Sequence, residues 1–90
     1  MTRSIFKYIL DAADVQEIQM PIGSTILSVG VQRDEICIWA LIEPDAVKVS
    51  RRIYICPTGR EADGLQRVKF LGTVMLHAGN LVFHVFTDNQ

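Results

Sequence analysis

Basic side chains gather in the second half of the chain, where they favour recognition of an anion. Arg51, Arg52 and Arg60 lie there, whereas seven of the ten acidic side chains precede residue 46. A guanidinium group offers a fork of N–H donors that fits phosphate or carboxylate oxygens. The turn Thr58-Gly59-Arg60 follows a predicted strand and a proline, and its glycine lets backbone N–H groups approach an anion. The candidate ligand-binding residues are Arg51, Arg52, Tyr54, Thr58, Gly59 and Arg60.

Two interpretations of these residues stay open. In the first, the three arginines and Tyr54 hold a small nucleotide-like anion at a subunit boundary. In the second, the charges are solvated groups on strand edges and loops. The turn lacks the longer glycine loop, the lysine and the following helix of a nucleotide-binding P-loop, so the pattern alone does not choose between the two.

Two histidines flank a predicted turn over residues 78–80. An imidazole side chain can bind a metal ion or carry a proton, so both histidines are candidates for these roles. A zinc site needs further ligands beside His77 and His84. Cys37 and Cys56 do not supply them, because both lie inside apolar segments and form no Cys-x-x-Cys pair. We therefore expect no metal site, histidines that are hydrogen-bonded to backbone groups at the end of a sheet, and cysteines that are buried in the core.

The sequence contains no familiar catalytic pattern. It has no Gly-x-Ser-x-Gly elbow and no His-Glu-x-x-His motif, and its carboxylates show no recognisable paired spacing. Trp39, Tyr54 and Tyr8 have rings that could stack on a base, but a tryptophan within Ile-Trp-Ala-Leu-Ile is typical of a core residue. These observations predict a protein that is not an enzyme and uses no cofactor.

The composition predicts one folded domain over residues 1–90. The chain is 49% hydrophobic and 21% charged, which gives it enough apolar surface to fold. A net charge of −1 predicts no general attraction to nucleic acid or to an anionic membrane. The longest apolar run, 36–42, is far shorter than the roughly 20 residues of a membrane helix. No signal peptide is evident, so we expect a cytoplasmic protein with reduced thiols.

Period-two alternation recurs along the chain between segments that contain Pro, Gly, Asp or Asn, and this pattern predicts strands rather than helices. We expect an all-β fold, either a small antiparallel barrel or a two-sheet sandwich of about seven strands that ends in a C-terminal hairpin. The alternative is an α+β domain with a short helix over 11–16 or 62–66. The predicted strands are Ser4–Leu10, Val15–Met20, Thr25–Gln32, Glu35–Glu43, Arg51–Cys56, Val68–Leu76 and Leu81–Phe86.

The apolar pattern also predicts the position of individual strands. Strand 35–43 is apolar on both faces and should be central, whereas strand 15–20 is rich in polar residues and should lie at an edge. The small residues Ser28 and Gly30 leave room for Trp39 of the next strand. The last strand is apolar on both faces, so a second sheet or a homo-oligomer must cover it.

Three segments of the chain are distinctive: Met-Pro-x-Gly from Met20, Ile-Trp-Ala-Leu-Ile-Glu-Pro from Ile38 and Leu-Val-Phe-His-Val-Phe from Leu81. In these segments, and over nearly its whole length, the chain resembles a family of short, uncharacterised bacteriophage and prophage proteins. The resemblance implies a phage-encoded protein that acts inside an infected bacterium. It brings no activity and no ligand residue with it.

By analogy with small phage proteins, we expect a binding module that occupies another molecule. The favoured form is a counter-defence inhibitor of a host protein that also self-associates. The alternatives are a protein that sequesters a small anionic nucleotide-like molecule, and a virion accessory protein.

Overall fold

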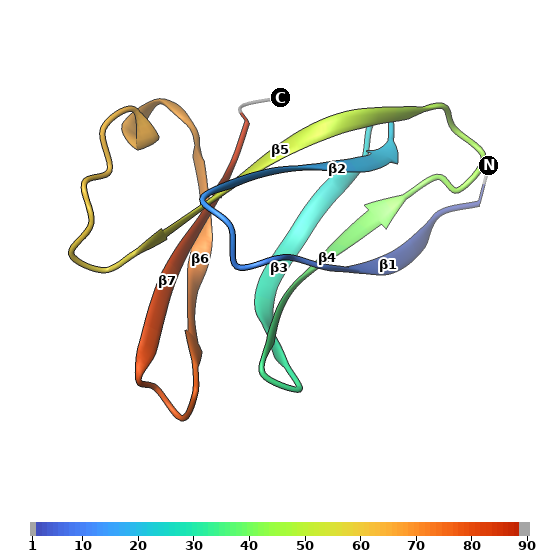
Figure 1. The fold of residues 1–90 in the computed structure, drawn as a ribbon. Helices are drawn as coiled ribbons and strands as arrows, with labels where there is room; N and C mark the ends of the chain where they lie inside the picture. Colours follow the sequence, from blue (N-terminus) through green and yellow to red (C-terminus); the bar gives the residue numbers. More distant parts are fainter. Residues whose placement is uncertain (1, 89–90) are drawn as a thin grey trace.

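The computed structural model describes residues 2–88, which form seven strands in two antiparallel sheets (Figure 1). The first sheet has the order β1-β4-β3, with β1 at Ser4–Ile9, β3 at Thr25–Gln32 and β4 at Glu35–Ile42. The second has the order β2-β5-β7-β6, with β2 at Val15–Pro21, β5 at Lys48–Pro57, β6 at Lys69–Leu76 and β7 at Leu81–Thr87. The all-β prediction is confirmed in its two-sheet form, since the sheets do not close into a barrel.

The strand positions inferred from the apolar pattern agree with the topology. β4 is the central strand of its sheet, and β2 is an edge strand of the other. Residues 11–16 form no helix, and the helical segment of the described chain is the short 3-10 helix η1 at Leu65–Arg67. The α+β alternative is therefore wrong, because one turn of helix within a loop does not build a layer.

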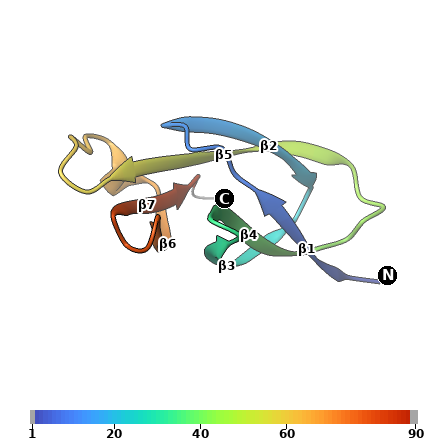
Figure 2. The same ribbon diagram turned by 60° about the horizontal axis from the view of Figure 1, so that its bottom comes forward.

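The core lies between the two sheets, which face each other in Figure 2 with β2 and β5 on one side and β1, β3 and β4 on the other. The even-numbered residues of β4 point into it, and Ile38 and Ala40 are completely buried. Ile53 of β5 and Val85 of β7 are also completely buried and close the core from the second sheet. Because side chains alternate along a strand, every second side chain points into the core, as a two-sheet sandwich requires.

The sheets come very close where β3 meets β6. A Cβ atom added to Gly72 of β6 would lie 2.6 Å from Cγ1 of Val29 on β3. No real Cβ tolerates such a distance, so glycine is required for this contact. Within the first sheet, a Cβ on Gly30 would lie 3.2 Å from Cζ3 of Trp39, which confirms that the indole covers this small residue.

The histidine positions differ in part from the prediction. His77 lies in the turn after β6 rather than in a strand, with a φ of 52°. Its N–H donates a 2.9 Å hydrogen bond to Oδ1 of Asp34, which lies in the two-residue turn between β3 and β4. The two hairpin turns are therefore tied to each other. His84 lies on β7, where its ring is held by two threonine side chains instead of the backbone groups that we expected.

β5 lies between β2 and β7 in the second sheet, and the last part of β5 has an edge that no strand covers. β2 pairs with β5 over Lys48–Tyr54, whereas β7 pairs with it over Ile53–Pro57 on the other side. Beyond Tyr54, β5 therefore has no strand on the β2 side. One backbone hydrogen bond continues the pairing, from the N–H of Ile55 to the carbonyl oxygen of Asp14. The segment that follows β5 folds back beside this open end.

Candidate functional site

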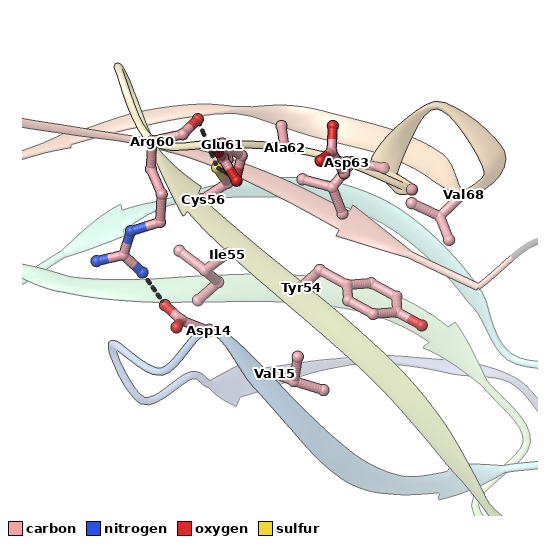
Figure 3. A pocket seen from close by; sticks show the side chains of 12 residues that line it. Asp14, Val15, Tyr54, Ile55, Cys56, Arg60, Glu61, Ala62, Asp63 and Val68 are labelled. Atoms are coloured by element: carbon pink, nitrogen blue, oxygen red, sulfur yellow. Dashed lines mark hydrogen bonds and ion pairs between the residues drawn. The ribbon is translucent and has the colours of Figure 1, made fainter.

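A hollow of about 400 Å³ lies between the end of β5 and the segment 60–68, and we call it the loop hollow (Figure 3). Tyr54, Ile55 and Cys56 of β5 form its floor. The segment that contains Leu65 and Val68 forms the opposite wall. The stagger of β2 and β7 on β5 creates this space, because it leaves the end of β5 uncovered on one side.

An ion pair crosses the open edge of β5. Nη1 of Arg60 donates to Oδ1 of Asp14, and Figure 3 shows the guanidinium extending past β5 to reach the carboxylate. Both side chains are largely exposed, so the pair adds little stability on its own. Its effect is geometric, since it links the start of the loop to the residue that precedes β2.

The hydroxyl group of Tyr54 forms a hydrogen bond within the protein, and its ring lines the loop hollow. The hydroxyl group donates to Oδ1 of Asp88, 3.1 Å away, at the end of β7. Oδ2 of Asp88 also accepts a hydrogen bond from the N–H of Arg52. The ring is therefore fixed at the side of the loop hollow and offers it an aromatic surface.

Carboxylates outnumber cations around the loop hollow. Asp14, Glu61 and Asp63 line it, and Arg60 is the basic residue among its lining side chains. Asp14 is paired with Arg60, whereas Glu61 and Asp63 have no ion-pair partner within residues 2–88. The site is therefore negative overall and favours a cationic group over an anion.

A smaller hollow of about 180 Å³ adjoins the first, and both are lined by Cys56, Arg60, Ala62 and Leu65. His84 and Thr58 lie at this second hollow. Nε2 of His84 is 2.7 Å from Oγ1 of Thr58, and Nδ1 is 2.9 Å from Oγ1 of Thr73. The imidazole of His84, which lies on β7, therefore links Thr58 at the start of the loop to Thr73 on β6.

The two cysteines are free thiols, and both are buried as predicted. Sγ of Cys56 lies 3.9 Å from the carbonyl oxygen of Arg60 and 3.8 Å from that of Glu61. The thiol of Cys56 thus contacts the backbone of the first part of the loop. Among the described residues, no group of three His, Cys, Asp or Glu side chains could hold a metal ion.

The model of one protein family, described as a domain of unknown function (DUF7352), matches residues 1–90. The chain belongs to this family. A search of curated proteins and a search of solved structures found no match. Within residues 2–88 of this DUF7352 chain, no helix has the length and apolar character needed to span a membrane.

The structure does not gather the six predicted ligand residues of the DUF7352 chain at one place. Tyr54 and Arg60 line the loop hollow, and Thr58 and Gly59 line the smaller one beside it. Alternation along β5 places Arg51 on the opposite face of the sheet, where it donates to the carbonyl oxygen of Ser24.

Arg52 is on the same face as Tyr54 but is already occupied by protein groups. It forms an ion pair with Glu17 of β2 at 3.3 Å. Hydrogen bonding to Tyr54, and next to Glu17, raises the pKa of Arg52. Of the three arginines predicted to bind a ligand, Arg52 and Arg60 thus each face a carboxylate of the protein, whereas Arg51 faces none among the described residues.

Sequence reasoning missed the acidic residues of the loop hollow and its apolar wall. Asp14 precedes β2 and Asp63 lies almost fifty positions later, and nothing in either segment shows that the two are near each other. The available signal was the polar segment that follows Pro57, which predicts a surface loop. It does not predict against which strand the loop folds.

Proposed function

We propose that this chain is a phage-encoded binding module without enzymatic activity, and that it inhibits a host protein by receiving a basic side chain of that protein in the loop hollow. The observation that carries the proposal is the lining of this hollow. It combines the ring of Tyr54 with Glu61 and Asp63, two carboxylates that have no partner among the described residues.

The chemistry of a lysine or arginine side chain fits these groups. The face of a tyrosine ring attracts a cation, and nearby carboxylates add to that attraction. The methylene groups of such a side chain can lie against Leu65 and Val68 while its charge stays near the acidic rim. An exposed aromatic and acidic hollow therefore favours a basic segment of a protein as its ligand.

The resemblance to short phage and prophage proteins supports the cellular context of the proposal. A protein of this kind would act in the cytoplasm of an infected bacterium. Inhibition of a defence component is the form of the function that this context favours.

The proposal is tested with acetyl-arginine amide and with short peptides that carry one lysine or arginine beside an apolar residue. Amide shifts in the NMR spectrum of the labelled protein should concentrate at Tyr54, Leu65 and Val68. In Glu61→Lys/Asp63→Lys, affinity should fall about tenfold or more, because each tenfold loss corresponds to about 1.4 kcal/mol of lost attraction.

Asp45→Lys provides the matched control, since Asp45 is an exposed acidic residue of another loop and does not line the loop hollow. A host protein that binds the wild type and Asp45→Lys, but not the double variant, should then be purified and its direct binding measured. Equal binding of basic and acidic peptides, or equal binding to the wild type and both variants, would contradict the proposal.

The alternative function, sequestration of a small anion, fits the loop hollow poorly because of its negative lining. Denaturing the protein purified from its bacterial host checks this alternative directly. Release of a stoichiometric ultraviolet-absorbing nucleotide would favour it over recognition of a protein.

A further inference from the structure

Arg51 is a buried cation on the inner face of β5. The residue is only 8% exposed, and its neighbours on that face of the strand are Val49 and Ile53. A guanidinium group stays charged at any pH that the folded protein tolerates. A charge buried among apolar side chains is costly unless an opposite charge or hydrogen bonds compensate for it.

The protein compensates for Arg51 only in part. Nη1 donates a 3.0 Å hydrogen bond to the carbonyl oxygen of Ser24. Nε is buried and has no hydrogen-bond partner. No carboxylate among the described residues forms an ion pair with this arginine. Arg51 therefore has unused donors and an unbalanced charge.

A third hollow, which we call the turn hollow, lies beside Arg51. Its volume is about 340 Å³, and its other lining residues are Val49 and the turn residues 22–25. No acidic side chain lines it. The turn is rigidly built, because the N–H and the hydroxyl group of Ser24 both donate to the carbonyl oxygen of Pro21, and Gly23 takes the positive φ of 80° that such a turn needs.

We infer that the turn hollow binds a small oxyanion, a carboxylate or phosphate group, through the guanidinium of Arg51. A planar guanidinium can give two parallel hydrogen bonds to either group. The anion would balance the buried charge that the protein leaves uncompensated. This site lies on the opposite face of the sheet from the loop hollow, so it does not depend on the proposed function.

The test uses inorganic phosphate and acetate as separate probes, with sodium chloride added to hold the ionic strength constant. The Nε–Hε signal of Arg51 and the amide signals of Gly23 and Thr25 should shift and saturate in the NMR spectrum. A probe at ten times its dissociation constant should raise the folding equilibrium constant about 11-fold. The stronger of the two responses identifies carboxylate or phosphate as the preferred group.

Arg51→Met removes the charge and should abolish the response to both probes. It should also fold at least as well as the wild type in anion-free buffer, because an uncompensated buried cation has been removed. Arg52→Met is the matched control, since it removes an exposed arginine at the adjacent position and should leave the response unchanged.

The inference fails if Arg51→Met keeps the wild-type response, or if neither probe shifts the Arg51 signal. Should Arg51→Met fail to fold, the titration of the wild type still decides the question. A stabilisation that sodium chloride reproduces at equal ionic strength would also overturn it, because that result indicates general screening.

Discussion

Gly72 illustrates how a single residue can fix the distance between two sheets. Its φ is not in the left-handed region, so the backbone alone would accept any side chain. The restriction comes from Cγ1 of Val29, which occupies the space where a Cβ would lie. Val29 itself packs against the buried core. This glycine is therefore required for the packing of β3 against β6 rather than for a turn.

Gly72→Ala should lower the free energy of unfolding by about 1–3 kcal/mol, because an extra methyl group must push the two strands apart. Denaturation by urea measures the loss. The double variant Gly72→Ala/Val29→Ala keeps the added methyl group but removes the Cγ1 atom of Val29 that it would meet. It should be more stable than the sum of the two single changes predicts. Strict additivity would show that the strands do not meet at this point.

Tyr8 should make the free energy of unfolding depend on pH in the alkaline range. Partial burial raises the pKa of Tyr8 above its usual value of 10.0, because the phenolate would be less well solvated in the folded protein than in water. The unfolded chain therefore loses this proton first. The contribution to stability is fully present below pH 10 and is lost as the pH rises through the pKa of the folded state.

In Tyr8→Phe, the free energy of unfolding should fall less steeply above about pH 10 than in the wild type, and the two curves should run parallel below it. Urea denaturation at a series of pH values provides both curves. Parallel curves over the whole range would show that the folded protein ionises Tyr8 as readily as the unfolded chain does.

At the scale of elements, the two hairpin turns depend on a contact that no local pattern shows. Arg33 and Asp34 have positive φ values of 54° and 60°, as expected for a two-residue hairpin turn. Asp34 uses this geometry to accept a hydrogen bond from the N–H of His77 in the other hairpin. The contact joins the β3–β4 hairpin of one sheet to the β6–β7 hairpin of the other.

Asp34→Gly should release this contact, because glycine keeps the left-handed backbone and removes the acceptor. The loss should be about 0.5–1.5 kcal/mol of stability. The His77 amide hydrogen should also exchange faster with solvent. Asp34→Asn retains an acceptor oxygen and should protect this amide as the wild type does. Equal exchange rates in the two variants would contradict the role given to the carboxylate.

The elements themselves were largely predictable, and the sites were not. Alternation of apolar residues predicted all seven strands of the described chain, the central position of β4 and the edge position of β2. Such patterns describe neighbours along one strand. The pairing of Arg60 with Asp14, the contact of Gly72 with Val29 and the burial of Arg51 depend on which strands meet, and a single sequence does not contain that information.

At the scale of the whole molecule, large apolar side chains remain on the surface. Ile5 and Ile9 of β1 are 60% and 53% exposed, and Leu27 of β3 is 50% exposed. The sequence predicts a homo-oligomer, and these side chains are the ones that a second copy would cover.

Light scattering after size exclusion should give a mass that is a multiple of the mass of one chain. Ile5→Lys and Leu27→Lys should lower it, because a charge at a covered apolar position opposes association. Thr2→Lys adds the same charge near the start of the chain, outside the strands, and should leave the mass unchanged. A monodisperse monomer for the wild type would remove self-association from the description of this protein.

The placement of β5 has a consequence for synthesis on the ribosome. The sheet β1-β4-β3 is complete once residue 42 has emerged, so this half can form while the remainder is still being made. β5 finds its first neighbour in the earlier β2 but must wait for β7, whose last residue is Thr87. The ring of Tyr54 at the loop hollow is held by Asp88, which follows β7, so recognition by this hollow should arise only after residue 88 has been made.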